Sequence, residues 1–271
     1  MQTRDDYFLS GGVRLRFRDE GQGMPVLFIH GWTVDLDVWN PQAAALSRSM
    51  RVIRLDRRGF GLSDGIPDRA ADCEDLRALL DHLGIARAAL VGASQGARVA
   101  LAFAMREPDR VVSVILDGPP DETGDSAAPG DGDFSVDDFR RLVRDRGVDA
   151  FRSAWRDNPL MKLHSADPAA QALLATMLGR YPARDLHERA SGPPPRIGAA
   201  ALARIPTATL VLNGQFDTQA RLRAGEQLAR ALPRAERVLI PDAGHLPNLD
   251  NPVAYNDAIG SFLRRQSRAA A

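Results

Sequence analysis

The sequence contains a single cysteine, Cys73, so no disulfide bond can form within the chain. Cys73 falls in an expected amphipathic helix, where a buried thiol is inert, and we expect it to be structural. No apolar stretch approaches the length of a membrane span. The N-terminal residues lack the apolar segment that marks a signal peptide. These absences favour a cytoplasmic protein that has no membrane partner.

The sequence also lacks an excess of charge of either sign, because 35 basic residues balance 35 acidic ones. Such a balance gives no support to a nucleic acid or an anionic membrane as partner. No Cys/His cluster indicates a metal site, and we expect neither a metal nor an organic cofactor. No interface signature indicates an oligomeric state. The chain is long enough for one large α/β domain with an inserted subdomain.

The most informative stretch joins a short apolar run, Ala88–Val91, to a long helix of small residues. Between them lies G-x-S-x-G, formed by Gly92, Ser94 and Gly96. This pattern is typical of a nucleophile elbow, a sharp strand-to-helix turn that exposes a serine hydroxyl. Glycine is needed where the backbone of such a turn approaches its neighbours closely. The start of the helix would favour negative charge developing on the serine.

A second motif, His30-Gly31-Trp32, ends the apolar run Pro25–His30 about sixty residues before the elbow. Together with the D-x-R-G-x-G-x-S stretch that begins at Asp56, these motifs resemble the α/β-hydrolase superfamily. The resemblance implies an α/β fold, in which helices flank a mostly parallel twisted sheet and a helical cap is inserted. It also implies that the backbone N–H groups of Trp32 and Gln95 form an oxyanion hole. We expect the His30 side chain itself to be structural.

The family resemblance also implies a catalytic triad. Asp217 follows the expected strand 207–213, and His245 lies in a loop after the expected strand 237–240. The chain order Ser94, Asp217, His245 is the order of this fold. Asp117, at the end of another expected strand, is the alternative candidate for the acid.

Residues 119–200 differ in character from the rest of the chain. We expect helices at 135–147, 149–157, 167–178 and 183–190, and no strand. The resemblance implies that this block is a cap (lid) inserted into a core formed by residues 1–118 and 201–271. Most of its apolar residues should pack against the core and a few should line the substrate pocket; these residues are Phe151, Trp155, Met161, Leu163, Met177 and Leu178. Two histidines of the block, His164 and His187, are expected at the surface.

Two further expectations concern the ends of the chain. The alternation of Val13–Arg18 predicts a half-buried strand at a sheet edge, with its arginines facing solvent. The last residues, 264–271, are expected to fray.

The residues favour a serine hydrolase that cleaves a carboxylic ester or lactone of a small, fairly apolar substrate through a Ser94 acyl-enzyme. A serine at position 94, in place of a carboxylate, argues against epoxide opening and halide displacement. Carbon–carbon bond hydrolysis of a β-diketone-like ring-cleavage product is an alternative, which a basic residue such as Arg98 would favour. A cofactor-free peroxidase (perhydrolase), a cofactor-free oxygenase and a non-catalytic ligand receptor also stay open. The Gln95 side chain would either contact the site or anchor a loop.

Overall fold

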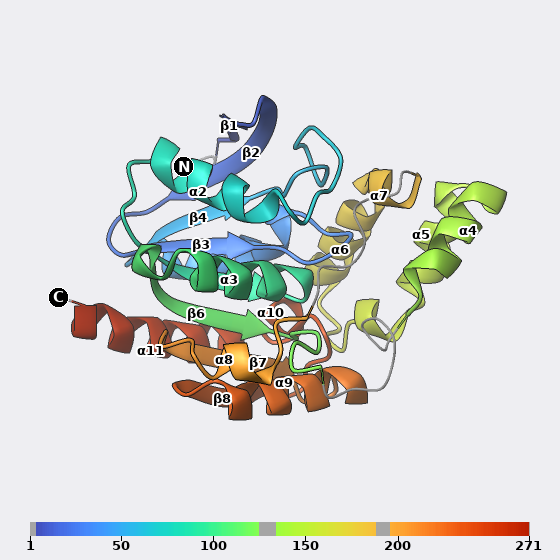
Figure 1. The fold of residues 1–271 in the computed structure, drawn as a ribbon. Helices are drawn as coiled ribbons and strands as arrows, with labels where there is room; N and C mark the ends of the chain where they lie inside the picture. Colours follow the sequence, from blue (N-terminus) through green and yellow to red (C-terminus); the bar gives the residue numbers. More distant parts are fainter. Residues whose placement is uncertain (1–3, 125–133, 188–195, 271) are drawn as a thin grey trace.

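The computed structural model describes residues 4–124, 134–187 and 196–270. They form a central sheet in the order β1-β2-β4-β3-β5-β6-β7-β8 (Figure 1). The strands are β1 (Asp6–Ser10), β2 (Val13–Glu20), β3 (Pro25–Ile29), β4 (Arg51–Leu55), β5 (Ala88–Ala93), β6 (Val111–Asp117), β7 (Thr209–Gly214) and β8 (Ala235–Ile240).

The sheet is parallel from β4 to β8, and the two pairings that involve β2 are antiparallel. Its central strands are near-continuous apolar runs and are buried along almost their whole length, as expected for strands with helices on both faces. The carboxyl ends of β5, β6 and β7 therefore meet at one edge, where Ser94, Asp117 and Asp217 follow their strands.

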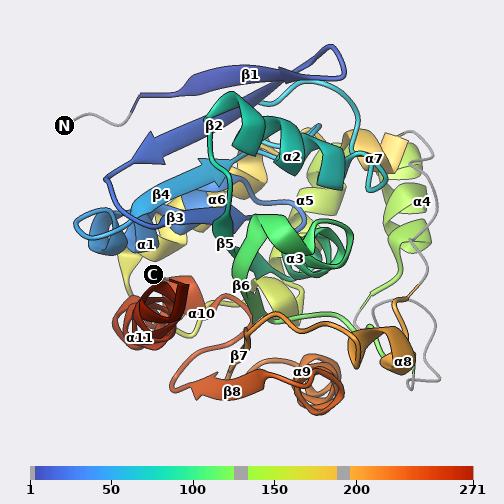
Figure 2. The ribbon, with the colours of Figure 1, turned by 60° about the vertical axis from the view of Figure 1, so that its left-hand side comes forward.

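Helices cover both faces of the sheet, as Figure 2 shows. One face carries α1 and α11, and the other carries α2, α3 and α9. The helices are α1 (Asn40–Leu46), α2 (Asp72–His82), α3 (Gln95–Arg106), α4 (Val136–Arg146), α5 (Val148–Arg156), α6 (Pro168–Arg180), α7 (Arg184–His187), α8 (Ala199–Leu202), α9 (Gln219–Ala231), α10 (Pro247–Asp250) and α11 (Pro252–Ala270), with 3₁₀ turns η1 (Leu36–Trp39), η2 (Pro108–Arg110) and η3 (Pro159–Met161).

The helices α4 to α7 lie beyond the carboxyl ends of the parallel strands (Figure 1). The described part of residues 119–200 contains helices and 3₁₀ turns and no strand. Ser135 begins α4 as expected, because its hydroxyl accepts a hydrogen bond from the Asp138 N–H at 3.2 Å. The last residues of the helix expected at 183–190, from 188 onwards, lie outside the described residues.

The prediction of an edge strand at Val13–Arg18 is wrong. The hairpin partner β1 lies outside β2 and forms the edge. Arg16 consequently does not face solvent: its side chain is 2% exposed and pairs with Asp56 at 3.1 Å and Asp5 at 2.9 Å. The alternation of apolar and polar residues identified the strand. It did not show that a further strand would pair with the edge of this strand, or that the Asp56 loop would cover its polar face.

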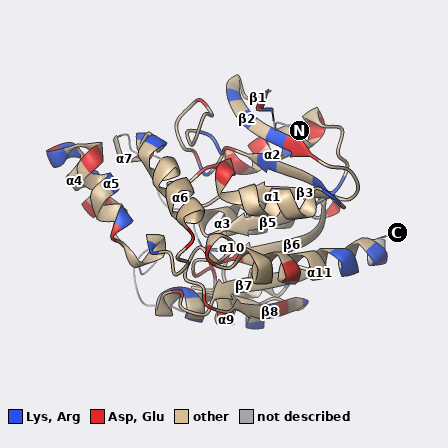
Figure 3. Cartoon of the chain, turned by 180° about the vertical axis from the view of Figure 1, so that it is seen from behind, with Lys and Arg blue, Asp and Glu red and all other residues tan. Residues whose placement is uncertain are grey.

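The expected fraying of residues 264–271 is also wrong as far as the structure describes them, because α11 continues to Ala270. Arg265 pairs with Glu236 of β8 at 2.5 Å, and the preceding Phe262 and Leu263 are buried. No helix of the described residues is long and apolar enough to cross a membrane. Figure 3 shows residues of both charge signs on helices such as α4 and α11.

Candidate active site

Ser94 occupies a strained turn between β5 and α3. Its backbone has φ +51° and ψ −114°, a combination that a residue with a side chain rarely adopts. A Cβ at Gly92 would lie 2.2 Å from the Gly96 carbonyl oxygen, and a Cβ at Gly96 would lie 2.2 Å from the Ile29 carbonyl oxygen. The two glycines of G-x-S-x-G are therefore required by close backbone approaches, as the sequence predicts for an elbow.

His245 and Asp217 come together from the loops after β8 and β7. The Asp217 Oδ1 atom lies 3.0 Å from His245 Nδ1, and both side chains are buried. Two further donors hold the carboxylate: the Thr218 N–H at 2.8 Å and Asn213 Nδ2 at 3.1 Å. Burial opposes ionisation of Asp217, but His245, Asn213 and Arg221 lower the pKa of its carboxyl group below the usual value. Asp217 is therefore poised as an anion that orients the imidazole.

Asp117, the alternative acid, occupies a different environment. Its Oδ2 atom accepts a hydrogen bond from the Tyr255 hydroxyl at 3.2 Å, and no described residue donates to its buried Oδ1. Burial and the neighbouring Asp217 charge raise the pKa of Asp117 well above the usual value. The structure thus places Asp217, and not Asp117, against His245. The Asp117 main chain still supports the elbow, because its carbonyl accepts the Ser94 N–H at 2.7 Å.

The loop after β3 passes directly beside the elbow. A Cβ at Gly31 would lie 3.3 Å from the Ala93 carbonyl oxygen and 3.4 Å from Ser94 Cβ, a tight fit that would require a shift of a few tenths of an ångström. Among the residues that the structure describes, none accepts a hydrogen bond from the backbone N–H of Trp32 or of Gln95. Both residues line the same pocket as Ser94. Two backbone N–H donors that lie beside a serine and have no partner among the described residues are the groups that form an oxyanion hole.

The His30 side chain is structural, as predicted. Its Nε2 atom accepts the Arg57 N–H at 2.9 Å and its Nδ1 atom lies 2.7 Å from the Gly31 carbonyl oxygen, which fixes the neutral tautomer with the proton on Nδ1. Burial and the adjacent Arg57 lower the pKa of His30 to about 3. The Gln95 side chain is held as well, because its Oε1 accepts from Arg57 at 3.3 Å.

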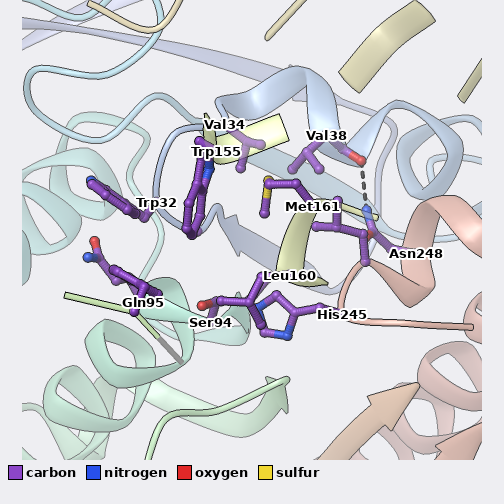
Figure 4. Close-up of a pocket in the computed structure, with 14 residues that line it drawn as sticks. Trp32, Val34, Val38, Ser94, Gln95, Trp155, Leu160, Met161, His245 and Asn248 are labelled. Atoms are coloured by element: carbon purple, nitrogen blue, oxygen red, sulfur yellow. Dashed lines mark hydrogen bonds between the residues drawn. The ribbon is translucent and has the colours of Figure 1, made fainter. Parts of the chain in front are cut away.

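A narrow pocket opens above Ser94 (Figure 4) and holds about 510 Å³ of space outside the protein atoms, part of it open to solvent. Its lining is Gly31, Trp32, Val34, Val38, Ala93, Ser94, Gln95, Phe134, Trp155, Leu160, Met161, His245, Leu246 and Asn248. Ser94 and His245 lie next to each other in the pocket, although no hydrogen bond joins these two described residues. Such bonds often form only when substrate binds.

Among the residues that the structure describes, the pocket lining contains no lysine or arginine. Arg98, one turn after Ser94 on α3, instead pairs with the buried Glu122. Lys162, the one lysine of the sequence, follows the lining residue Met161 and is exposed. The pocket therefore offers an apolar surface with a few neutral polar groups, and no cation to bind a carboxylate.

The remaining titratable candidates lie away from the pocket. His164 and His187 are exposed, as predicted. Cys73 is buried, and burial raises the pKa of its thiol to about 11, as expected for a structural cysteine. No group of three or more His, Cys, Asp or Glu side chains within the described ranges could hold a metal ion.

Comparison with known proteins agrees with this geometry. The sequence model of the α/β hydrolase fold family matches residues 24–252. The 2-hydroxymuconate semialdehyde hydrolase of Pseudomonas sp. (strain CF600) is 30% identical over 97% of this chain and 94% of its own. A thermophilic esterase from Thermogutta terrifontis has a TM-score of 0.78 and 29% identity, over 97% of this chain and 99% of that one. The enol-lactonase of Burkholderia xenovorans LB400 has a TM-score of 0.82 and 26% identity, over 96% of this chain and 100% of that one. The chain belongs to the α/β-hydrolase family and is an enzyme, a hydrolase of small molecules.

Proposed function

We propose that the protein hydrolyses an uncharged carboxylic ester or lactone through an acyl-enzyme on Ser94. The observation that carries this proposal is the largely apolar pocket, which holds Ser94 beside the His245–Asp217 pair and whose described lining contains no lysine or arginine. An apolar pocket favours an uncharged acyl group, because a carboxylate buried there without a partner would be strongly destabilised.

In the acylation step, Ser94 Oγ attacks the carbonyl carbon as His245 Nε2 takes the hydroxyl proton. Asp217 keeps the other imidazole proton on Nδ1 and stabilises the imidazolium that forms. The backbone N–H groups of Trp32 and Gln95 donate to the oxyanion of the tetrahedral intermediate, an interaction worth roughly 3–4 kcal/mol per donor in such sites. The intermediate collapses as His245 gives its proton to the departing alkoxide.

In the deacylation step, His245 takes a proton from water, and the resulting hydroxide attacks the acyl carbon. Ser94 leaves with the proton returned by His245, and the carboxylic acid is released. A lactone follows the same course, with the alcohol still attached to the acyl group. No step requires a group that the described residues do not supply.

We also propose that residues 119–200 act as a cap, above a core of residues 1–118 and 201–271. Phe134, Trp155, Leu160 and Met161 come from this block and line the pocket opposite Ser94. Their bulk would set the size of the acyl group that is accepted. Substitutions there should change the preferred chain length more than the rate with the best substrate.

The test is the pre-steady-state release of p-nitrophenol from p-nitrophenyl acetate, with Ser94→Ala as the control. A burst or a steady turnover that disappears in the variant supports a Ser94 acyl-enzyme, and an equal rate in both proteins contradicts it. A matched pair of esters then tests the pocket. We expect p-nitrophenyl butyrate to react at least about 10-fold faster than the hemisuccinate, whose terminal carboxylate would enter a site that holds no cation.

A second candidate is carbon–carbon bond hydrolysis of a β-diketone-like compound. The likeness to a 2-hydroxymuconate semialdehyde hydrolase supports it. The pairing of Arg98 with Glu122 argues against it, because the basic residue that would favour this chemistry already has a partner. Turnover of a β-diketone bearing a carboxylate, at a kcat/KM above that of the butyrate ester, would establish this candidate in place of the first.

A further inference from the structure

Trp32 is held by a carboxylate from the opposite side of the pocket. Its indole Nε1 donates to Asp185 Oδ2 at 2.7 Å, although Asp185 lies on α7, 153 residues further along the chain. The other oxygen of the same carboxylate accepts from the Tyr181 hydroxyl. All three side chains are buried, so two buried donors share one buried acceptor group.

The next residue of the same loop is held in a similar way. Thr33 has φ +66°, which a β-branched residue rarely adopts. Its Oγ1 donates to the Trp32 carbonyl at 2.6 Å and accepts from Trp155 Nε1 of α5 at 2.7 Å. A strained backbone beside the proposed oxyanion hole is thus fixed by an indole that comes from the helices above it.

A third contact ties down the end of this loop. Arg180, the last residue of α6, forms a double hydrogen bond to Asp35, with distances of 2.5 Å from Nε and 2.6 Å from NH2. The side chains that bind Trp32, Thr33 and Asp35 from outside the loop therefore lie, among the described residues, within α5 to α7, and the Asp37 N–H of η1 also donates to Asp35 Oδ1 at 3.0 Å. The side chains of the described core residues make no hydrogen bond to these three side chains.

We infer that Asp185 is a positioning residue for the oxyanion hole, an inference that rests on the proposed function. The Trp32 N–H belongs to the Gly31–Trp32 peptide. This peptide lies between the anchored Trp32 indole and the adjoining Trp32–Thr33 peptide, which Thr33 and Trp155 hold in place. The hole is then complete only while α5 to α7 are docked against the loop. Movement of these helices to admit substrate would loosen Trp32, and their return would restore the donor to the oxyanion.

The test compares Asp185→Leu with wild type in the acylation of p-nitrophenyl butyrate and in the binding of butylboronic acid. The boronate forms a tetrahedral adduct on a nucleophilic serine and places an oxygen where the oxyanion develops. Leucine is similar in size to Asp185 but has no acceptor for the Trp32 N–H, whereas asparagine could accept from Trp32 and donate to Tyr181. We expect the acylation rate to fall about 10- to 100-fold with KM changed less than 3-fold, and the boronate Ki to rise by a similar factor.

Simple electrostatics predicts the opposite sign, because removing a negative charge near a developing oxyanion would speed acylation. A change confined to KM, an unchanged boronate Ki or a faster acylation would overturn the inference.

Trp32→Phe removes the same hydrogen bond from the other partner, so the double variant should lose no more acylation rate than the worse single variant. Losses that multiply in the double variant would also contradict the inference.

Tyr181→Phe is the matched control, because it removes the second hydrogen bond to Asp185 and leaves the bond to Trp32 in place. We expect it to change the acylation rate less than 3-fold. The wild-type measurements separate the two proposals. A wild-type burst with unchanged Asp185→Leu constants rejects the positioning role alone. The absence of both a burst and boronate binding in the wild type rejects both proposals.

Discussion

At the scale of single residues, the two buried carboxyl groups behind His245 differ in ionisation. His245, Asn213 and Arg221 favour the charged form of Asp217, whereas burial and the Asp217 charge favour the neutral form of Asp117. An asparagine should therefore be a poor substitute for Asp217 and a close mimic of Asp117.

The corresponding prediction concerns kcat for ester hydrolysis. Asp217→Asn should lower kcat by about 10³- to 10⁴-fold, because the imidazole loses its anionic partner and its tautomer is no longer fixed. Asp117→Asn should change kcat only a few-fold. The reverse pattern would assign the acid to Asp117.

A second prediction at this scale concerns His30 and acid stability. Its pKa is about 3 in the folded protein, against 6.5 for an unperturbed histidine. Below pH 6.5 the unfolded chain therefore binds a proton that the folded protein does not, and stability falls as the pH falls towards 3. At pH 5 this proton uptake by the unfolded chain should lower the free energy of unfolding by about 2 kcal/mol.

Urea denaturation of wild type and His30→Asn at pH 7 and pH 5 measures this difference. The variant removes the titrating group, so the wild type should lose about 2 kcal/mol more between the two pH values than the variant. Equal losses in the two proteins would show that His30 does not cause the effect.

The residues of the site divide into those that local sequence identifies and those that it does not. Ser94 was predictable because close backbone approaches require glycine at positions 92 and 96, whereas Trp32, Asp217 and His245 were predicted from the resemblance to the family. Asn213 was not predicted, because no motif marks the turn that brings it to Asp217, and Asp185 was not, because its contact depends on how distant segments pack. Asp185 in particular lies in a helix of ordinary composition, and no local pattern indicates that its partner is Trp32.

At the scale of elements, the elbow depends on the close packing of α3 against β3. A methyl group at Gly96 would meet the Ile29 carbonyl oxygen at 2.2 Å, and a backbone atom cannot turn aside. Gly96→Ala should therefore lower the free energy of unfolding by about 1–3 kcal/mol. It should also lower kcat, because the neighbouring Gln95 N–H would move.

Gly179 provides the matched control for this prediction. It lies within α6, and an added Cβ would meet no atom within 4 Å. Gly179→Ala should raise the free energy of unfolding by about 0.5–1 kcal/mol, because alanine favours the helix and restricts the unfolded chain. Urea midpoints of the two variants, displaced in opposite directions from the wild type, would support this account of the elbow.

Element types were predictable where the apolar pattern was clear, as in the apolar run of β3 and in the helices α4 to α6. The strand β1 was missed, because its short sequence alternates weakly and its pairing comes from the hairpin with β2. The burial of Arg16 was missed as well, because the sequence did not show that Asp5 and Asp56 would pair with it. The continuation of α11 to Ala270 depends on packing against β8, which its own sequence does not reveal.

At the scale of the whole molecule, one apolar cluster joins the helices α5 and α6 to the sheet. Phe151, Trp155 and Met177 belong to the same buried cluster as Phe28 and Trp39. A shared core favours a single cooperative unfolding transition over separate melting of the two parts.

Phe151→Ala tests this cooperativity. The truncation should cost about 3–5 kcal/mol and should lower one common transition, seen at the same temperature by far-ultraviolet circular dichroism and by tryptophan fluorescence. An early transition in fluorescence, with the remaining circular dichroism lost only at the wild-type temperature, would show that the helices above the pocket unfold separately.

Lys162 has a practical consequence for handling the protein. Apart from the α-amino group, it carries the one primary amine of a chain whose other basic side chains are guanidinium groups. Coupling to an amine-reactive support or dye would therefore attach the enzyme beside Met161, at the pocket that holds Ser94. Lys162→Arg would remove this attachment next to a pocket-lining residue while keeping the charge.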